Sequence, residues 1–187
     1  MKNQAFLLKF SIFSFVIVAI LGVLMRYKIA FSLPFVEQKH LQEAHSHFAF
    51  YGFITSCIYI LVAQYLSKTV IGIQMKKYQI LIGINFFASY GMLLSFLCAG
   101  YFWLSIIFST IALLNSFVYY FFLYRDLKNL QETSKIWFLA AFFFAVLSSL
   151  GVFTLSYMMS TKNVVQELYL ASTSAIVTGK QIGRAHV

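Results

Sequence analysis

Residues 38–66 read QKHLQEAHSHFAFYGFITSCIYILVAQYL, and this stretch decides the fold. From His45 to Leu66 it contains no Asp, Glu, Lys or Arg. About 20 apolar residues are enough for a helix to cross the hydrocarbon core of a bilayer. The sequence therefore predicts a transmembrane helix over 45–66, with His40, His45 and His47 gathered at its start.

Four further apolar runs have the length of a membrane span: 5–25, 78–97, 102–124 and 136–158. Each run is continuously apolar and not alternating, which favours helices over the strands of a barrel. The chain is 61% hydrophobic and 10% charged, values typical of an integral membrane protein and outside the range of soluble domains. We expect an all-α polytopic membrane helix bundle of five transmembrane helices over residues 1–160.

Small and polar residues inside the runs predict how the helices pack. We expect Gly83, Gly91 and Gly151 to face neighbouring helices, and Asn85 and Asn115 to make hydrogen bonds between helices. The two cysteines, Cys57 and Cys98, lie in or at the end of apolar runs and are expected to be small buried hydrophobes with no disulfide or metal clamp between them.

The basic residues predict the orientation. The net charge is +9, and the Lys and Arg residues fall mainly between the apolar runs, where they set topology and do not indicate a nucleic-acid partner. One side of the bilayer would carry four of them: Arg26, Lys28, Lys39 and Lys162. The other would carry eight: Lys2, Lys9, Lys68, Lys76, Lys77, Arg125, Lys128 and Lys135. The more basic side is cytoplasmic by the positive-inside rule. We expect a multi-pass protein of the inner (cytoplasmic) membrane with its N-terminus in the cytoplasm.

Residues 161–187 form a tail that does not continue the pattern of spans. Its last six residues, 182–187, read IGRAHV, which looks like the translation of a common short-read sequencing adapter, and the alternative is a genuine basic tail. We expect these six residues to be non-native and the chain to be an N-terminal fragment. His186 is therefore not counted as a ligand.

The histidine cluster is the main chemical feature. Successive residues of an α-helix advance by about 100°, so His45 and His47 would point in opposite directions and could not share one metal ion. His40 and His47 are seven residues apart and fall on one stripe. The four-residue spacing of a metal clamp on one helix is absent. A haem differs, because one helix supplies one axial histidine and another helix supplies the partner.

Two interpretations of this cluster remain open. His45 or His47 would be a haem axial ligand or another metal ligand, with the remaining histidines as neighbours and Gly52 giving close approach to a flat ring. Glu43, one turn before His47, would orient that imidazole or be a solvated carboxylate. Alternatively, the histidines are interfacial residues that lie among lipid headgroups or cap a helix. The predicted spans contain no Asp or Glu, which argues against proton-coupled transport, and no catalytic motif is present.

Residues 21–30 read LGVLMRYKIA, with Gly22 and Arg26 ahead of Pro34, and residues 44–47, AHSH, stand at the start of the second span. On these residues, the stretch from about residue 10 to 66 resembles subunit I of haem-copper oxidases and their nitric-oxide-reductase relatives. That family has about twelve spans, and its remaining haem and copper ligands lie in spans that this chain lacks. Leu41-Gln42-Glu43 also replaces the family's usual residues before the ligand.

The resemblance implies a function. It implies the N-terminal fragment of a haem-binding respiratory protein that transfers electrons through haem iron, with the lipid bilayer and other respiratory-complex subunits as partners. The alternative is a non-redox multi-pass protein, such as a transporter or an accessory or assembly subunit. The sequence indicates no catalytic residues and leaves open whether the protein is an enzyme.

Overall fold

The computed structural model describes residues 2–31, 34–70, 72–128, 136–141 and 143–144, and this part of the chain is helical with short links and without strands. The helices are α1 (Lys2–Ala30), α2 (Gln38–Phe48), the π-helical segment η1 (Ala49–Thr55), α3 (Ser56–Thr69), α4 (Met75–Ala99) and α5 (Trp103–Leu127). The chain divides into two compact units, Met1–Tyr119 and Tyr120–Val187. The first unit holds the histidine cluster.

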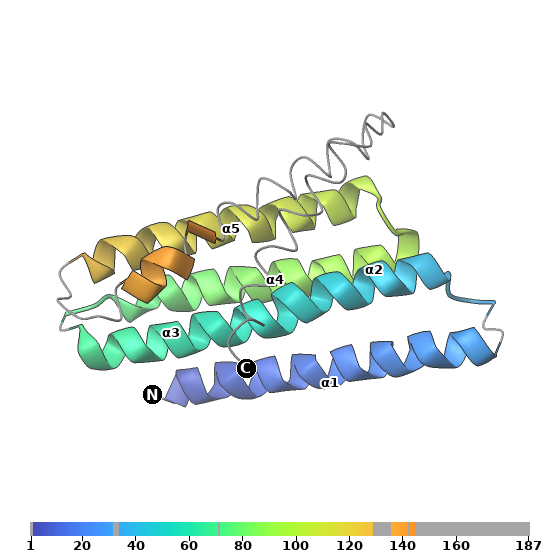
Figure 1. The fold of residues 1–187 in the computed structure, drawn as a ribbon, viewed down its shortest axis with the longest axis horizontal. Helices are drawn as coiled ribbons and strands as arrows, with labels where there is room; N and C mark the ends of the chain where they lie inside the picture. The colour runs from blue at the N-terminus through green and yellow to red at the C-terminus, as the bar shows by residue number, and fades with distance from the viewer. Residues whose placement is uncertain (1, 32–33, 71, 129–135, 142, 145–187) are drawn as a thin grey trace. The chain divides into compact units, whose positions relative to one another are not determined.

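Four helical segments are long and apolar enough to cross a membrane, and α2, η1 and α3 together make one of them, Gln38–Thr69 (Figure 1). The shortest has 25 residues, about 37 Å at 1.5 Å per residue, more than the hydrocarbon core of ~30 Å. The predicted all-α fold is thereby confirmed, with four helices in the described part of the chain that are long and apolar enough to span a membrane. Of the predicted fifth span over 136–158, residues 136–141 and 143–144 are helical. The rest of that span and the tail 161–187 lie outside the described residues, and the orientation stays a prediction.

The helices extend beyond the predicted spans. The second helix begins at Gln38 instead of His45, and α5 continues to Leu127 instead of ending at residue 124. An apolar run marks the part of a helix that lies in hydrocarbon, whereas the helix itself continues for as long as its backbone bonds are made. Glu43 and Asp126, which the sequence places outside the spans, are consequently helical.

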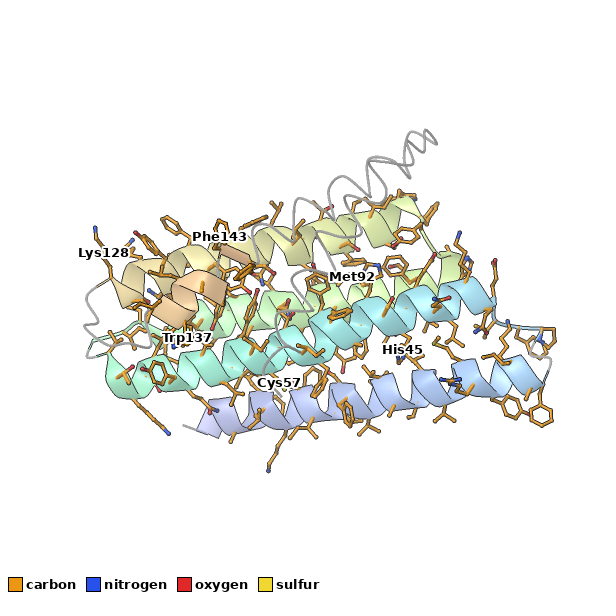
Figure 2. All side chains as sticks on the ribbon, in the orientation of Figure 1. His45, Cys57, Met92, Lys128, Trp137 and Phe143 are labelled. Atoms are coloured by element: carbon orange, nitrogen blue, oxygen red, sulfur yellow. The ribbon has the colours of Figure 1, made fainter. Side chains whose placement is uncertain are left out.

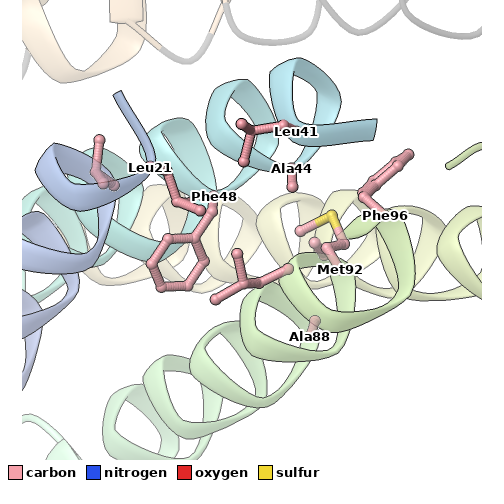
Figure 3. Packing of buried hydrophobic residues seen from close by; sticks show 10 residues of the cluster. Leu21, Leu41, Ala44, Phe48, Ala88, Met92 and Phe96 are labelled. Carbon is pink, nitrogen blue, oxygen red and sulfur yellow. The ribbon is translucent and has the colours of Figure 1, made fainter. Parts of the chain in front are cut away.

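The core of the first unit joins α1, α2 and α4. Figure 3 shows Leu41, Ala44 and Phe48 of α2 with Ala88, Met92 and Phe96 of α4, and Leu21 of α1 belongs to the same buried cluster. Because Ala44 and Ala88 have short side chains and are fully buried, they allow α2 and α4 to approach closely. This packing fixes the position of α2, the helix that carries the histidines, against α1 and α4.

The packing predictions for the small and polar residues have mixed outcomes. A Cβ on Gly91 would lie 2.5 Å from the Phe108 ring of α5, so Gly91 faces a neighbouring helix as predicted. Gly83 has no such neighbour within 4 Å, and Gly151 lies outside the described residues. Asn115 Nδ2 donates to the Leu81 carbonyl at 3.1 Å, which confirms one predicted interhelical bond.

The cysteines are both free. Cys57 is half-buried, with its Sγ 3.1 Å from Ser11 Oγ, whereas Cys98 is exposed at the surface of the protein. The prediction that both are buried is therefore wrong for Cys98, whose position on α4 turns it away from the neighbouring helices.

Candidate functional site

The three histidines of α2 contact two different parts of the first unit. His45 faces α1 at Gly22, whereas His47 faces the link between α4 and α5 at Tyr101. His40 contacts the same link at Gly100. This arrangement matches the predicted angles, because His40 and His47 share a stripe and His45 lies on the opposite side.

His47 is held by two aromatic neighbours. Its Nε2 lies 3.0 Å from the Tyr101 hydroxyl oxygen, and its ring stacks on Phe96 with 4.5 Å between centroids and 9° between planes. Burial raises the pKa of the Tyr101 hydroxyl, and the negative charge of Glu43 raises that pKa further. The hydroxyl therefore keeps its proton and is available as a donor to His47. This imidazole has a defined structural role between α2 and the α4–α5 link.

The side chains of His40 and Glu43 lie directly against Gly100. The φ of Gly100 is +59°, in the region that favours glycine, and a Cβ there would lie 2.5 Å from His40 Nε2 and 3.2 Å from Glu43 Oε2. His40 Nε2 also lies 3.3 Å from Glu37 Oε2. Glu43 Oε2 is buried without a hydrogen-bond partner. Glu43 therefore approaches Gly100, and the hydrogen bond of His47 goes to Tyr101.

His45 differs from the other two histidines because its imidazole makes no hydrogen bond within the described residues. Its Nδ1 is buried and has no partner. A Cβ on Gly22 of α1 would lie 3.3 Å from its Cε1 atom, so the ring packs closely against the α1 backbone. Figure 2 shows His45 on the side of α2 that is turned toward α1. Of the predicted ligands, His45 is the one whose imidazole has no hydrogen bond or ion pair within the described residues.

Gly52 lies in the middle of η1, directly after the histidines. The space beside it holds the Phe48 ring of the same helix, because a Cβ on Gly52 would lie 2.6 Å from Phe48 Cε2. Gly52 therefore accommodates a side chain of its own helix. Whether it also lies near a bound ring stays a prediction.

Within the described part of the chain, no group of three or more His, Cys, Asp or Glu side chains is placed to hold a metal ion. The first unit also has an apolar groove of about 520 Å³ between α1, α4 and α5, whose lining includes Phe10, Tyr90 and Phe108. No histidine lines this groove.

Sequence reasoning missed Tyr101 and Phe96 as neighbours of the histidine stretch. Tyr101 and Gly100 lie in a short uncharged link between two apolar runs. Such a link predicts a tight turn, but it does not predict that the turn contacts α2. The predicted interhelical hydrogen bonding of Asn85 is confirmed, because its Nδ2 donates to the Tyr51 carbonyl and to Ser56 Oγ. No protein-family model, curated protein or solved structure matches this chain.

Proposed function

We propose that this chain is the N-terminal part of a haem-binding respiratory membrane protein, resembling oxidase subunit I, and that His45 supplies one axial ligand. The observation that supports this proposal is the difference between the three histidines. His40 is paired with Glu37 and His47 with Tyr101, whereas His45 has no hydrogen-bond partner within the described residues. An imidazole whose nitrogens are unused is the one available to iron.

The surroundings of His45 fit this role in two respects. The glycine at position 22 lets α1 pack against the imidazole and restrict its rotation. Leu21 of α1 and Ala44 of α2, next in sequence to the two contacting residues, are buried in the apolar cluster beside His45. Haem iron, when bound, would supply a one-electron redox centre. The residues of this chain would orient one ligand and exclude water from its helix face.

The second axial ligand would come from outside the described residues. The histidines of the described part, His40, His45 and His47, all lie on α2. One helix commonly supplies one axial ligand, so we propose that a helix beyond the described part or another respiratory subunit completes the site. The proposed location is the cytoplasmic membrane with the N-terminus inside and the histidine cluster at the outer face.

A pair of matched variants tests the proposal. The complete gene is expressed with adequate haem supply, and reduced-minus-oxidised spectra are recorded for the purified membrane protein and for its His45→Gln and His47→Gln variants. We expect a haem α-band in the parent, its loss in His45→Gln and its retention in His47→Gln. Absence of haem bands from the parent contradicts the proposal, and retention of an unchanged band in His45→Gln contradicts the assignment of the ligand.

A non-redox role is the second candidate, and the structural partners of His40 and His47 favour it. In an accessory or assembly subunit, these side chains would join α2 to the α4–α5 link without binding a cofactor. Replacement of all three histidines by glutamine would then lower the stability of the protein. The metal and haem content would be zero in the parent and in the triple variant alike. A loss of haem on this replacement would reject the non-redox role.

A further inference from the structure

The helix that carries the histidines changes its winding directly after them. Residues Ala49–Thr55 form a π-helical segment between α2 and α3. A π-helical turn bonds each N–H five residues back instead of four, so it contains one more residue than an α-helical turn. Such turns are rare, and those that do occur are often found at functional sites. This one begins two residues after His47.

Side chains from two neighbouring helices hold this segment. Asn85 of α4 donates from Nδ2 to the Tyr51 carbonyl and to Ser56 Oγ, both at 2.8 Å. Ser56 Oγ donates in turn to the Tyr51 carbonyl at 3.0 Å. On the other side, Ser11 of α1 donates to the Phe53 carbonyl at 3.3 Å. In a bilayer, backbone carbonyls must find partners within the protein, and these donors supply them.

Asn85 is the central member of this network. Its side chain is fully buried, and its Oδ1 has no hydrogen-bond partner. A buried amide with one unsatisfied end is unfavourable, so an apolar residue would suit this position better if packing were the whole requirement. The two bonds of its Nδ2 to the π-helical segment offset that penalty.

The extra residue also sets the direction of the histidines. With the same sequence in uninterrupted α-helix, residues before the segment would be rotated by about 100° relative to α3. His45 would then leave Gly22, and His47 would leave Tyr101. We infer that Asn85 is a positioning residue, which holds the π-helical turn and thereby aims His45 at α1 and His47 at the α4–α5 link. What the aimed His45 binds rests on the proposed function, whereas the aiming itself does not.

A double-mutant cycle between Gly22 and Asn85 tests this inference on the full chain in detergent micelles. Gly22→Ala places a methyl group 3.3 Å from His45 Cε1, so the His45 ring must shift, and this steric effect opposes the gain in helix propensity of α1. In the Asn85→Leu background His45 has turned away, so Gly22→Ala should show only the gain in helix propensity, and its change in melting temperature should be more favourable than in the parent. Distant sites that act independently show additive effects. Additive effects of Gly22→Ala and Asn85→Leu would therefore overturn the inference.

Asn115→Leu is the matched control for this cycle. Asn115 is also a buried asparagine whose Nδ2 donates to a backbone carbonyl of α4, and that bond lies within the α4–α5 pair instead of reaching η1. We expect Gly22→Ala to be additive with Asn115→Leu. If Asn85→Leu does not fold, Ser56→Ala is used in the same cycle, with the same two outcomes, because it removes both bonds that Ser56 Oγ makes in this network, with Asn85 and with the Tyr51 carbonyl.

Deletion of one residue from the segment gives an independent test. Removal of Ile54, an exposed residue of η1, should convert the turn to α-helix and keep the directions of both flanking helices. Asn85 is then no longer needed for aiming, so the coupling between positions 22 and 85 should disappear. Removal of Leu61, an exposed residue of α3, rotates its neighbours and should prevent folding. Equal damage from both deletions would contradict the inference.

Haem content separates this inference from the proposed function. In the complete protein, Asn85→Leu should lower haem occupancy relative to Asn115→Leu. Absence of haem from every variant would reject the proposed function while the cycle at positions 22 and 85 still decides the role of Asn85. Equal haem occupancy in the two asparagine variants would overturn the positioning role at the haem site.

Discussion

His47 Nε2 and the hydroxyl oxygen of Tyr101 lie 3.0 Å apart, although the two residues are 54 positions apart in the sequence. The bond joins α2 to the short link between α4 and α5. Phe96 completes the contact, because its ring stacks on His47 and meets the edge of Tyr101. The histidine stretch and this link therefore form one local structure. Substitutions in the link should change the contacts of His47.

Tyr101→Phe should destabilise the protein modestly. The change removes the hydroxyl and keeps the ring, so His47 Nε2 loses its protein partner while the aromatic contacts remain. A hydrogen bond at a partly exposed site contributes about 1 kcal/mol to the free energy of unfolding. Thermal unfolding in detergent measures the effect. Tyr27→Phe is the control, since Tyr27 is exposed and its ring stacks on Phe31. Equal melting temperatures of the Tyr101→Phe variant and the parent would show that the bond does not contribute.

The same tyrosine predicts a loss of stability at alkaline pH. Burial, with the charge of Glu43, raises the pKa of Tyr101 in the folded protein above the ordinary value of 10.0. The unfolded chain therefore releases this proton at lower pH than the folded protein. The stabilising contribution is complete below pH 10, and it is lost as the pH rises through the pKa of the folded protein. Above pH 10 the parent should lose stability faster than Tyr101→Phe, as measured by melting temperatures at a series of pH values. Parallel curves would contradict the prediction.

Two glycines with positive φ allow backbone strain to be separated from steric contact. Gly72 has φ +80° and open space within 4 Å of the place that an alanine methyl group would take, whereas Gly100 has φ +59° and faces His40 and Glu43. Strained backbone of this kind is unfavourable by about 1–3 kcal/mol. Gly72→Ala should lower the free energy of unfolding through backbone strain alone. Gly100→Ala should lower it by more, because the steric contact with His40 and Glu43 is added to the strain. Adding His40→Ala should restore part of the difference at Gly100 and nothing at Gly72, as read from chemical unfolding. Equal effects of the two alanines would argue against the contact at Gly100.

Much of the fold is predictable from the sequence, and the reasons differ between residues. The apolar runs predict the four spanning helices, because hydrophobicity is a local property. The opposite directions of His45 and His47 follow from helix geometry alone. The start of the second helix at Gln38 cannot be predicted in this way, because its first residues are polar and lie outside the apolar run that marks the span. The π-helical segment is equally hidden. It depends on Asn85, 34 positions from the carbonyl of Tyr51, and the residues around it are apolar on all sides, so no periodicity reveals the extra residue.

The packing of α1 against α3 predicts a disulfide that can be made from a native cysteine. Ser11 Oγ lies 3.1 Å from Cys57 Sγ. In Ser11→Cys the new sulfur would take nearly the same place, within reach of the S–S bond length of about 2.05 Å after small rotations of the side chains. With Cys98 replaced by serine, mild oxidation should protect both remaining thiols from maleimide labelling in the monomeric protein.

Ser14→Cys is the matched control for this disulfide. Ser14 is also fully buried on α1, but its hydroxyl lies 3.1 Å from that of Tyr90 on α4 instead of approaching Cys57. We expect Ser14→Cys to leave Cys57 reactive after the same oxidation, once detergent unfolding makes the thiols accessible to the reagent. Because α1 carries Gly22 and α3 continues from η1, a disulfide at 11–57 reports the same packing that brings α1 to His45. Protection in both variants, or in neither, would contradict the arrangement of α1 against α3.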